Sequence, residues 1–241
     1  MLVLTEAILR NDIPKDVKVY TIPPGAMVTE SARRYAELHG IRLEKASFGS
    51  MSRTPIDRSS AAPYVDAETG KPYAEKPENM THLSGNRLVP KSHPRIALRA
   101  ELDAVQSDII LLQCMCEERR NRELLAALDE VLECVRTVLG CEVKEQAVPA
   151  FSMFGMDAET LRRASHNVRE SIGIDHPIPD YRMGRVCAEL NRLRTRIRKA
   201  ELAAVAAFEN DPDRQDLILT LNRLSSAVYL LFVKEVKRLG R

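Results

Sequence analysis

The feature of the sequence that most constrains its fold is a helical repeat of apolar residues that continues from Pro94 almost to the C-terminus. Apolar residues recur there every three or four positions, which is typical of amphipathic helices. Four such stripes are Leu98, Leu102, Val105, Ile109 and Leu112; Leu124, Leu128, Val131, Val135 and Val138; Leu161, Ala164 and Val168; and Leu217, Leu221, Leu224, Val228 and Leu231. A further helix is expected from about Gly184 to Phe208. Because most connections are short, the pattern predicts a five-helix bundle over residues 80–241.

Capping residues predict where several of these helices begin and end. Asp157 is the expected N-cap of the third helix, because its side chain can accept a hydrogen bond from the first turn. Pro212 follows Asp211 in the first turn of the fifth helix, where no backbone N–H is needed. The second and third helices are expected to end near Gly140 and Gly173, since glycine readily adopts the left-handed cap conformation.

Residues 1–46 predict a small α/β module ahead of the bundle. Its expected elements are a short helix at 5–10, a strand at 17–22, a helix at 29–39 and a strand at 41–44. Gly40 is expected to close the second of these helices. Residues 47–79 are rich in Ser, Pro, Gly and charge and lack a sustained apolar period, which indicates a linker or mobile loop.

Charge and cysteine content exclude several classes of protein. Lys and Arg number 36 against 34 Asp and Glu, which argues against a general nucleic-acid or membrane-surface binder. The five cysteines are odd in number and include no Cys-x-x-Cys pair, so neither a disulfide framework nor a zinc ribbon is expected. There is no continuous run of about eighteen apolar residues and no signal-peptide pattern. The sequence therefore predicts a soluble cytoplasmic protein.

A row of charged residues on the fourth helix is the most informative pattern for function. Arg194, Arg198 and Glu201 fall within an arc of about 60°, on a line shared with apolar residues. One interpretation is an exposed helix stabilised by weak Arg–Glu pairs. The apolar neighbours favour the other interpretation, in which two half-buried guanidiniums bind an anion such as phosphate.

Two polar residues on other helices have a similar context. Asp103 shares a line with Ile96 and Ile110, so it needs a cationic partner unless it lies at the rim of the bundle. Asn222 lies on the broad apolar face of the fifth helix. A buried asparagine can bond one helix to another, and it can also bind a ribose or an adenine edge.

These residues together resemble the propanediol-utilization-type cobalamin adenosyltransferases. Residues 193–201, Leu-Arg-Thr-Arg-Ile-Arg-Lys-Ala-Glu, resemble the Arg-Thr-x-x-Arg-Arg-Ala-Glu signature of that family. Residues 222–226, Asn-Arg-Leu-Ser-Ser, are similar to its Asn-Arg-Leu-Ser-Asp motif at the matching distance. Residues 81–83, 91–96 and 102–103 resemble its phosphate-side segment and first-helix aspartate.

Other segments are more similar to the ethanolamine-utilization branch of the same family. They are residues 4–6, 29–33, 76–83, 175–177 and 190–195. The resemblance thus covers nearly the whole chain, and several separated motifs in the right order are much more specific than any one motif.

The resemblance implies a homo-oligomer, with a trimer favoured, whose active sites lie between subunits. It implies that Arg198, Lys199 and Glu201 surround ATP, that Asn222 contacts the adenosine end, and that Lys91 and Thr81 face the triphosphate. Arg194 is expected to pair with Asp103 across the interface, and this pair is expected to fix the site where both substrates meet.

The implied reaction needs no nucleophile from the protein. Cobalt(I) of reduced cobalamin attacks the 5′-carbon of ATP and triphosphate leaves, so the protein contributes placement and charge. Lys91, Arg198 and Lys199, with Mg²⁺, are expected to stabilise the departing triphosphate. An apolar wall that removes the lower axial ligand of cobalt is expected to include Ile178 or Tyr181.

The sequence departs from the family pattern in two ways. Residues 73–79 replace the glycine-rich phosphate loop and contain no glycine, which leaves Lys76 as the candidate substitute. Residues 47–79 contain neither Cys nor His, whereas some ethanolamine-type relatives carry a metal motif there, so no structural metal is predicted. Cys114 and Cys116 diverge by about 200° on a helix, which favours buried thiols over a metal site.

The main rival interpretation is a non-enzymatic module that binds corrinoid or tethers enzymes in a microcompartment. Such a module needs no triphosphate site, whereas this chain retains Lys91, Arg198, Lys199 and Asn222 together. The N-terminal module can serve for tethering or can simply cap the bundle. Expected partners are ATP, reduced cobalamin, a reductase and microcompartment proteins, and no nucleic acid or membrane.

Overall fold

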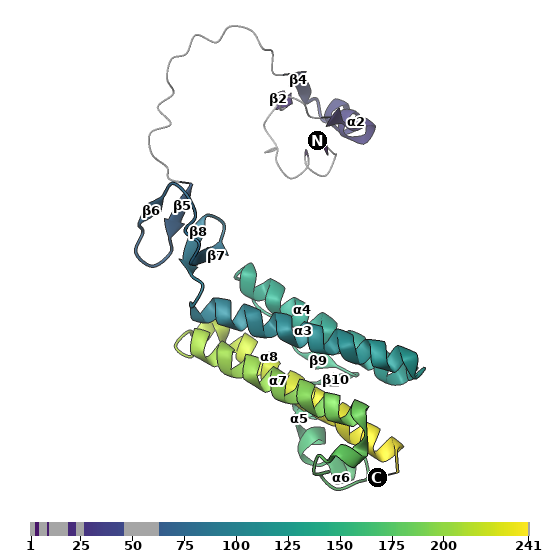
Figure 1. Cartoon of the computed structure of the whole chain (residues 1–241). Helices are drawn as coiled ribbons and strands as arrows, with labels where there is room; N and C mark the ends of the chain where they lie inside the picture. Colours follow the sequence, from purple (N-terminus) through teal and green to yellow (C-terminus); the bar gives the residue numbers. More distant parts are fainter. Residues whose placement is uncertain (1–2, 5–8, 10–18, 23–26, 46–62, 241) are drawn as a thin grey trace. The chain divides into compact units, whose positions relative to one another are not determined.

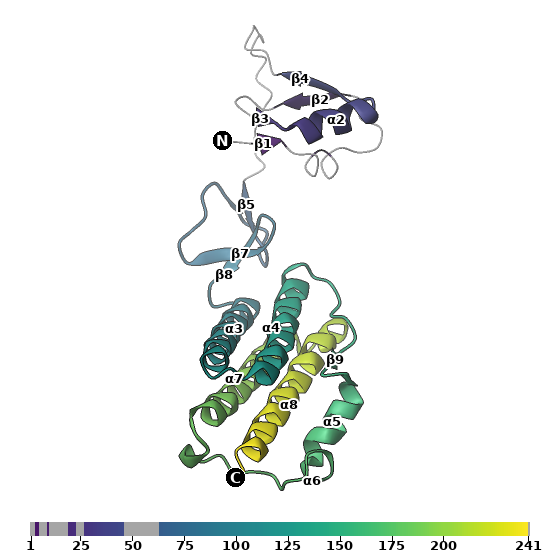
Figure 2. The same cartoon turned by 90° about the vertical axis from the view of Figure 1, so that its right-hand side faces the viewer.

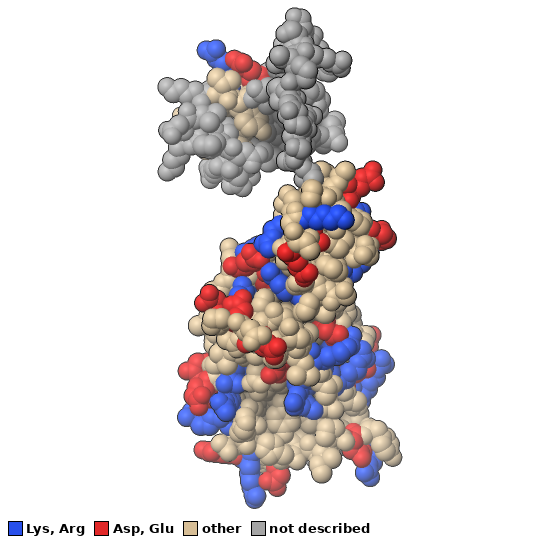
Figure 3. Space-filling model, turned by 90° about the vertical axis from the view of Figure 1, so that its left-hand side faces the viewer, with Lys and Arg blue, Asp and Glu red and all other residues tan. Residues whose placement is uncertain are grey.

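A computed structural model describes residues 3–4, 9, 19–22, 27–45 and 63–240 of the chain (Figure 1). The chain divides into two compact units, Met1–Ser59 and Ser60–Arg241. Lys and Arg side chains are interspersed with Asp and Glu over the face shown in Figure 3, in keeping with the near balance of charge.

The N-terminal unit contains one described helix and two parallel strand pairs. Its elements are β1 (Val3–Leu4), β2 (Val19–Ile22), β3 (Met27–Val28), α2 (Glu30–Leu38) and β4 (Arg42–Lys45), with β1 paired to β3 and β2 to β4. Thr29 caps α2 by accepting a hydrogen bond from Ala32 N, and Gly40 follows the helix with φ +66°. The predicted α/β character is confirmed. The short helix predicted at residues 5–10 lies, apart from Leu9, outside the described residues.

A four-stranded sheet precedes the helices of the second unit. Its strands are β5 (Tyr64–Asp66), β6 (Pro72–Tyr73), β7 (Met80–Ser84) and β8 (Arg87–Pro90), in the order β6-β5-β8-β7. β5 pairs in parallel with β8, so that Val65 lies opposite Arg87. Residues 64–66 and 72–73 therefore form strands where the sequence indicated a linker or mobile loop. β5 also forms a short antiparallel pair with β6, but its parallel partner β8 is distant in sequence, and three residues are too few to show an apolar period.

The helical part is the predicted bundle, and Figure 2 shows its long helices running obliquely side by side. Its helices are α3 (Pro94–Glu118), α4 (Arg122–Val143), α5 (Ala158–His166), α6 (Val168–Ser171), α7 (Arg185–Phe208) and α8 (Gln215–Arg238), with short 3₁₀ turns η1 (Tyr181–Met183) and η2 (Pro212–Arg214). A two-strand hairpin, β9 (Ser152–Met153) and β10 (Met156–Asp157), precedes α5. α7 packs against both α3 and α8, α4 packs against α3, and α5 packs against α8.

The predicted stripes all lie in the core of the bundle, together with the buried face of α7. All of their residues are buried except Ala164, which is partly buried. Asp157 accepts a hydrogen bond from Thr160 N at 2.8 Å, which confirms it as the N-cap of α5. Three helix boundaries differ from the prediction. α4 continues past Gly140 to Val143, the third helix is interrupted at Asn167, and the predicted first turn of the fifth helix is the 3₁₀ turn η2 before α8 begins at Gln215.

The two neighbouring thiols of α3 lie in different environments. Cys116 is buried, and its burial raises the pKa of the thiol to about 11. Cys114 is exposed, so the prediction of two buried thiols is wrong for this residue. The wide angle between positions two residues apart on a helix directs one side chain to the core and the other to the surface.

Among the described helices, α8 together with η2 is long and apolar enough, by length and composition, to cross a membrane. However, 61% of its most apolar window is buried inside the protein. The buried core helix of a bundle can be as long and as apolar as a membrane-spanning helix, and the burial of α8 is typical of such a core helix.

One buried carboxylate connects α3, α4 and the sheet. Glu142 of α4 is fully buried and pairs with Arg95 Nε and Arg99 Nε of α3, both at 2.5 Å. Arg95 also pairs with Glu145, and Arg99 Nη2 donates to the carbonyl of Leu83 in β7 at 2.9 Å. Because both guanidiniums of α3 share the Glu142 carboxylate of α4, this cluster fixes the start of α3 against the end of α4.

Candidate active site between α5, α7 and α8

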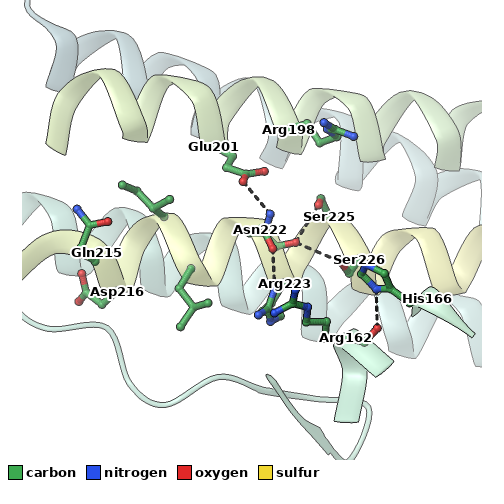
Figure 4. A pocket seen from close by; sticks show the side chains of 12 residues that line it. Arg162, His166, Arg198, Glu201, Gln215, Asp216, Asn222, Arg223, Ser225 and Ser226 are labelled. Carbon is green, nitrogen blue, oxygen red and sulfur yellow. Dashed lines mark hydrogen bonds between the residues drawn. The ribbon is translucent and has the colours of Figure 1, made fainter. Parts of the chain in front are cut away.

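A pocket of about 810 Å³ lies between α5, α7 and α8 (Figure 4). Its lining consists of Arg162 and His166 from α5, Arg198 and Glu201 from α7, and Gln215, Asp216, Ile218, Leu219, Asn222, Arg223, Ser225 and Ser226 from α8. Three arginines, two carboxylates and two hydroxyls thus face one open space. Such a lining suits a polar, negatively charged ligand better than an apolar one.

Asn222 is the centre of the hydrogen bonds in this pocket (Figure 4). Its Nδ2 donates to Glu201 Oε1 at 2.8 Å, and its Oδ1 accepts from Arg223 Nη1 at 2.6 Å. Its backbone oxygen accepts from Ser225 Oγ at 2.8 Å. Since a carboxylate only accepts and a guanidinium only donates, the orientation of the amide is determined. Asn222 therefore fixes a carboxylate of α7 and a guanidinium of α8 in place.

Arg194 and Arg198 bring positive charge to the same side of α7. Arg198 is exposed and lines the pocket. Arg194, one turn earlier, is half-buried and donates from Nε and Nη2 to Asn191 Oδ1 at 3.2 and 3.0 Å. Burial, and then the charge of Arg198, lower the pKa of Arg194. Neither guanidinium forms an ion pair within the described residues, so a bound anion would stabilise both.

The remaining charges leave the pocket positive. Arg223 is only 9% exposed, and its Nε has no hydrogen-bond partner in the part of the chain that the structure describes. Asp216 accepts from Val148 N at 2.6 Å and from Leu217 N at 2.8 Å. Glu201 is held by Asn222. The two carboxylates are therefore already bonded, while Arg198 and Arg223 retain free donors.

Lys199 lies on a different side of α7 from this pocket. It pairs with Glu101 of α3 at 2.8 Å, and Arg192 pairs with Asp108 of the same helix at 2.6 Å. Neighbouring helical positions differ by about 100° in direction, so Lys199 faces α3 while Arg198 faces the pocket. The structure thus brings Arg198, Glu201 and Asn222 together, with Arg194 close by, and does not bring Lys199 to them.

The predicted phosphate-side residues lie in and after the small sheet. Thr81 is in β7, and Lys91 follows β8 with its Nζ 2.9 Å from Glu78 Oε1. Lys76, the candidate substitute for the missing loop, donates to the carbonyl of Met80 at 3.2 Å. None of these residues lines the pocket within one chain.

Asp103 and the two predicted corrinoid contacts are exposed. Asp103 accepts from Gln106 Nε2 at 3.4 Å and forms no ion pair with Arg194 within the described chain. Ile178 and Tyr181, in the segment between α6 and α7, are 84% and 85% exposed. These residues are therefore available to a ligand or a second subunit, and the pairing of Asp103 with Arg194 stays a prediction.

Several residues of the pocket are additional to the predicted set. Arg162 and His166 of α5 are four residues apart, a spacing that places both on one face of a helix. That signal is present in the sequence, but it is common on exposed helices. Arg223 stands beside Asn222 in a recognised motif, and only the structure shows that its side chain reaches the pocket.

Comparison with known proteins identifies the class of protein. Residues 73–235 match the sequence profile of the cobalamin adenosyltransferases, and the chain belongs to this family. It is 27% identical to the corrinoid adenosyltransferase EutT of Salmonella typhimurium and 29% identical to EutT of Escherichia coli. Both similarities cover 98% of this chain and 92% of the relative.

A solved structure supports the fold. A variant of the PduO-type ATP:corrinoid adenosyltransferase from Lactobacillus reuteri, complexed with cobalamin and ATP, superposes with a TM-score of 0.53. The match has 16% sequence identity and covers 66% of this chain and 91% of that protein. The predicted family and the predicted bundle are both confirmed.

Proposed function

We propose that this chain is an ethanolamine-utilization-type enzyme that transfers the 5′-deoxyadenosyl group of ATP to cobalt(I) of cobalamin. The observation that carries the proposal is the convergence of Arg198, Glu201 and Asn222 on one positively charged pocket, in a chain of this family. The near full-length similarity to two EutT adenosyltransferases supports the ethanolamine branch.

In this reaction an electron pair of cobalt(I) forms a bond to the 5′-carbon of ATP. The bond between that carbon and its oxygen breaks, and the oxygen leaves with its electron pair as triphosphate. Charge therefore gathers on the leaving group, and fixed cationic donors stabilise it without reorganisation. Arg198 is the cation best placed for this role in the pocket, with Lys91 and Thr81 serving the triphosphate from the sheet.

The adenosine end is assigned to Asn222 and Glu201. Their mutual hydrogen bond presents an amide and a carboxylate at fixed positions, which suits the hydroxyls of a ribose or the edge of a base. Lys199, which pairs with Glu101, supports this site through the position of α7, and its predicted contact with ATP is proposed for the assembled oligomer.

Mg²⁺ is expected to enter with the triphosphate. Among the described residues, no group of three or more His, Cys, Asp and Glu side chains could hold a metal ion. Mg²⁺ commonly binds through substrate phosphates, water and only one or two carboxylates. The residues present are thus compatible with a nucleotide-borne ion, which would neutralise charge on the phosphates.

The active site is proposed to be completed by a second copy of the chain, in a trimer. Asp103 is exposed on α3, and Ile110 on the same helix is 46% exposed, so this helix offers a carboxylate and apolar surface to a neighbour. Arg194 of the adjoining subunit would pair with Asp103. Ile178 and Tyr181 are proposed to face the corrin ring near this seam.

We also propose that a reductase supplies cobalt(I) to this enzyme. The protein is proposed to be cytoplasmic and to associate with a microcompartment. The rival, a tethering module without activity, is favoured only by the separate N-terminal unit. It would not need the hydrogen-bonded pocket residues.

An anaerobic assay tests the activity directly. When ATP is added to the protein and cob(I)alamin, loss of the cobalt(I) absorbance should accompany formation of adenosylcobalamin and one equivalent of triphosphate. Arg194→Ala is expected to lower kcat/KM at least tenfold, because it removes the half-buried cation beside Arg198. Arg136→Ala, on the exposed face of α4, is the control. Equal rates for the Arg194→Ala variant and the wild type would contradict its place in the site.

Arg162 is expected to contribute to ATP binding from α5. Arg162→Ala should raise KM for ATP about tenfold with little change in kcat. We expect Arg162 to bind the phosphates equally in the ground state and the transition state, so its loss weakens ATP binding without changing the barrier from bound ATP. Steady-state kinetics with varied ATP measure this, and the effect should weaken at high salt. The control is Arg163→Ala, which changes the adjacent exposed arginine outside the lining. The same KM in both variants would place Arg162 outside the ATP site.

A further inference from the structure

His176 anchors the segment that joins α6 to α7. Its Nδ1 lies 2.6 Å from the hydroxyl of Tyr229 in α8, and its Nε2 lies 3.2 Å from the carbonyl of His166 in α5. A carbonyl only accepts, so Nε2 carries the hydrogen and Nδ1 accepts from the tyrosine. The two rings also stack, with centroids 5.8 Å apart. One side chain thus connects this segment to two helices.

The anchor determines the course of the residues that follow. Pro177 and Pro179 restrict their own φ angles, and they also restrict His176 and Ile178, the residues before them, to extended conformations. Further along, Asp180 accepts a hydrogen bond from Arg182 N at 2.8 Å and caps the short turn η1. With the segment stiff on both sides, fixing His176 fixes the direction of Ile178.

The same anchor touches the nucleotide pocket. The side chain of His166 lines that pocket, while its carbonyl accepts from His176. Tyr229 is seven residues after Asn222, which places both on one face of α8. Burial raises the pKa of Tyr229, although the nearby charge of Arg194 opposes this, so its hydroxyl keeps the proton that it donates.

The exposed apolar residues of the segment need a partner. Ile178 and Tyr181 lie within five residues of His176 and are almost fully exposed. Large apolar side chains that are held rigidly in solvent are typical of a binding surface. The flat apolar face of a corrin ring is a matching ligand, and it has to approach ATP in the neighbouring pocket.

We propose that His176, held by Tyr229 and the His166 carbonyl, is a positioning residue that presents Ile178 and Tyr181 to the corrin ring. The inference rests on the proposed function, because it assumes that the ring is the ligand of this segment. His176 itself does not touch either substrate. Through its hydrogen bond to the carbonyl of His166, it connects the segment that would bind the corrinoid to a residue that lines the nucleotide pocket.

Kinetics of two ring-preserving variants test the proposal. Tyr229→Phe removes only the hydroxyl, and His176→Phe removes both hydrogen bonds. Each variant should raise KM for cob(I)alamin about tenfold and leave KM for ATP within about twofold, a separation that general destabilisation does not produce. The double variant should be no worse than His176→Phe, because both changes break one connection.

Trypsin provides a readout that does not depend on activity. Cleavage after Arg182, in the anchored segment, should be at least about fivefold faster in both variants, because local opening exposes the chain. His39→Phe is the control, since His39 stacks on Tyr35 in the N-terminal unit and should change neither readout. If the wild type is active and Tyr229→Phe changes neither KM for cob(I)alamin nor the rate of cleavage, this inference is wrong and the proposed function stands. A wild type that transfers no adenosyl group overturns the proposed function as well.

Discussion

Replacement of Asn222 with alanine is expected to lower kcat/KM for ATP about 100-fold. The change removes the donor to Glu201 and the acceptor of Arg223, so a carboxylate and a buried guanidinium both lose their positions. Hydrogen bonds to charged groups contribute more than neutral ones, and losing two of them accounts for about 2.7 kcal/mol of transition-state stabilisation. Anaerobic kinetics with varied ATP measure the effect.

The matched control for this prediction is Asn210→Ala. Asn210 is exposed in the turn after α7 and does not line the pocket. Its loss should leave kcat/KM within about twofold of the wild type, in line with most exposed substitutions. Circular dichroism of both variants shows whether the bundle is intact. A folded Asn222→Ala variant with wild-type kinetics would move the adenosine site away from α8.

Glu142→Ala is expected to destabilise the bundle by about 3–5 kcal/mol, because it leaves the half-buried charges of Arg95 and Arg99 without their shared partner. Urea denaturation followed by circular dichroism should show a lower midpoint with a similar slope. Glu133→Ala, on the exposed face of the same helix, should shift stability by no more than about 0.5 kcal/mol. A change below about 1 kcal/mol in Glu142→Ala would show that the cluster does not stabilise the start of α3.

Most of the bundle follows from local sequence. The stripes beginning at Leu98, Leu124 and Leu217 are buried as predicted, because a helix forms its hydrogen bonds within one segment and its period is visible there. The strand β5 is different. It pairs with β8 across a stretch that includes β6 and β7, and nothing in residues 64–66 themselves indicates that partner.

The candidate site was predicted in part, and helix geometry explains the difference. Arg198, Glu201 and Asn222 were grouped by motif and converge on one pocket. The same motif places Lys199 with them, yet one step along a helix directs it to α3. Such a difference in direction is visible from spacing only when the neighbouring helices are known. The assignment of Lys199 to ATP remains a prediction for a contact in the assembled oligomer.

Contacts between residues that are distant in sequence could not be predicted. His176 and Tyr229 are separated by more than fifty residues, and their hydrogen bond depends on how α8 passes the segment before α7. Arg162 reaches the pocket only because α5 packs against α8. The sequence identifies side chains that can do chemistry, and the packing of helices selects which of them do so together.

The ion pairs between α3 and α7 have an evolutionary consequence. Lys199 with Glu101 and Arg192 with Asp108 connect α7, which bears the nucleotide motif, to α3, which is proposed to face a neighbouring subunit. Loss of Lys199 or Arg192 leaves its carboxylate with only a longer contact to Arg196 across these helices, 3.8 Å from Glu101 and 4.0 Å from Asp108. Relatives should therefore change these positions in compensating pairs, and correlated substitution at 101 and 199 would mark lineages that keep this arrangement.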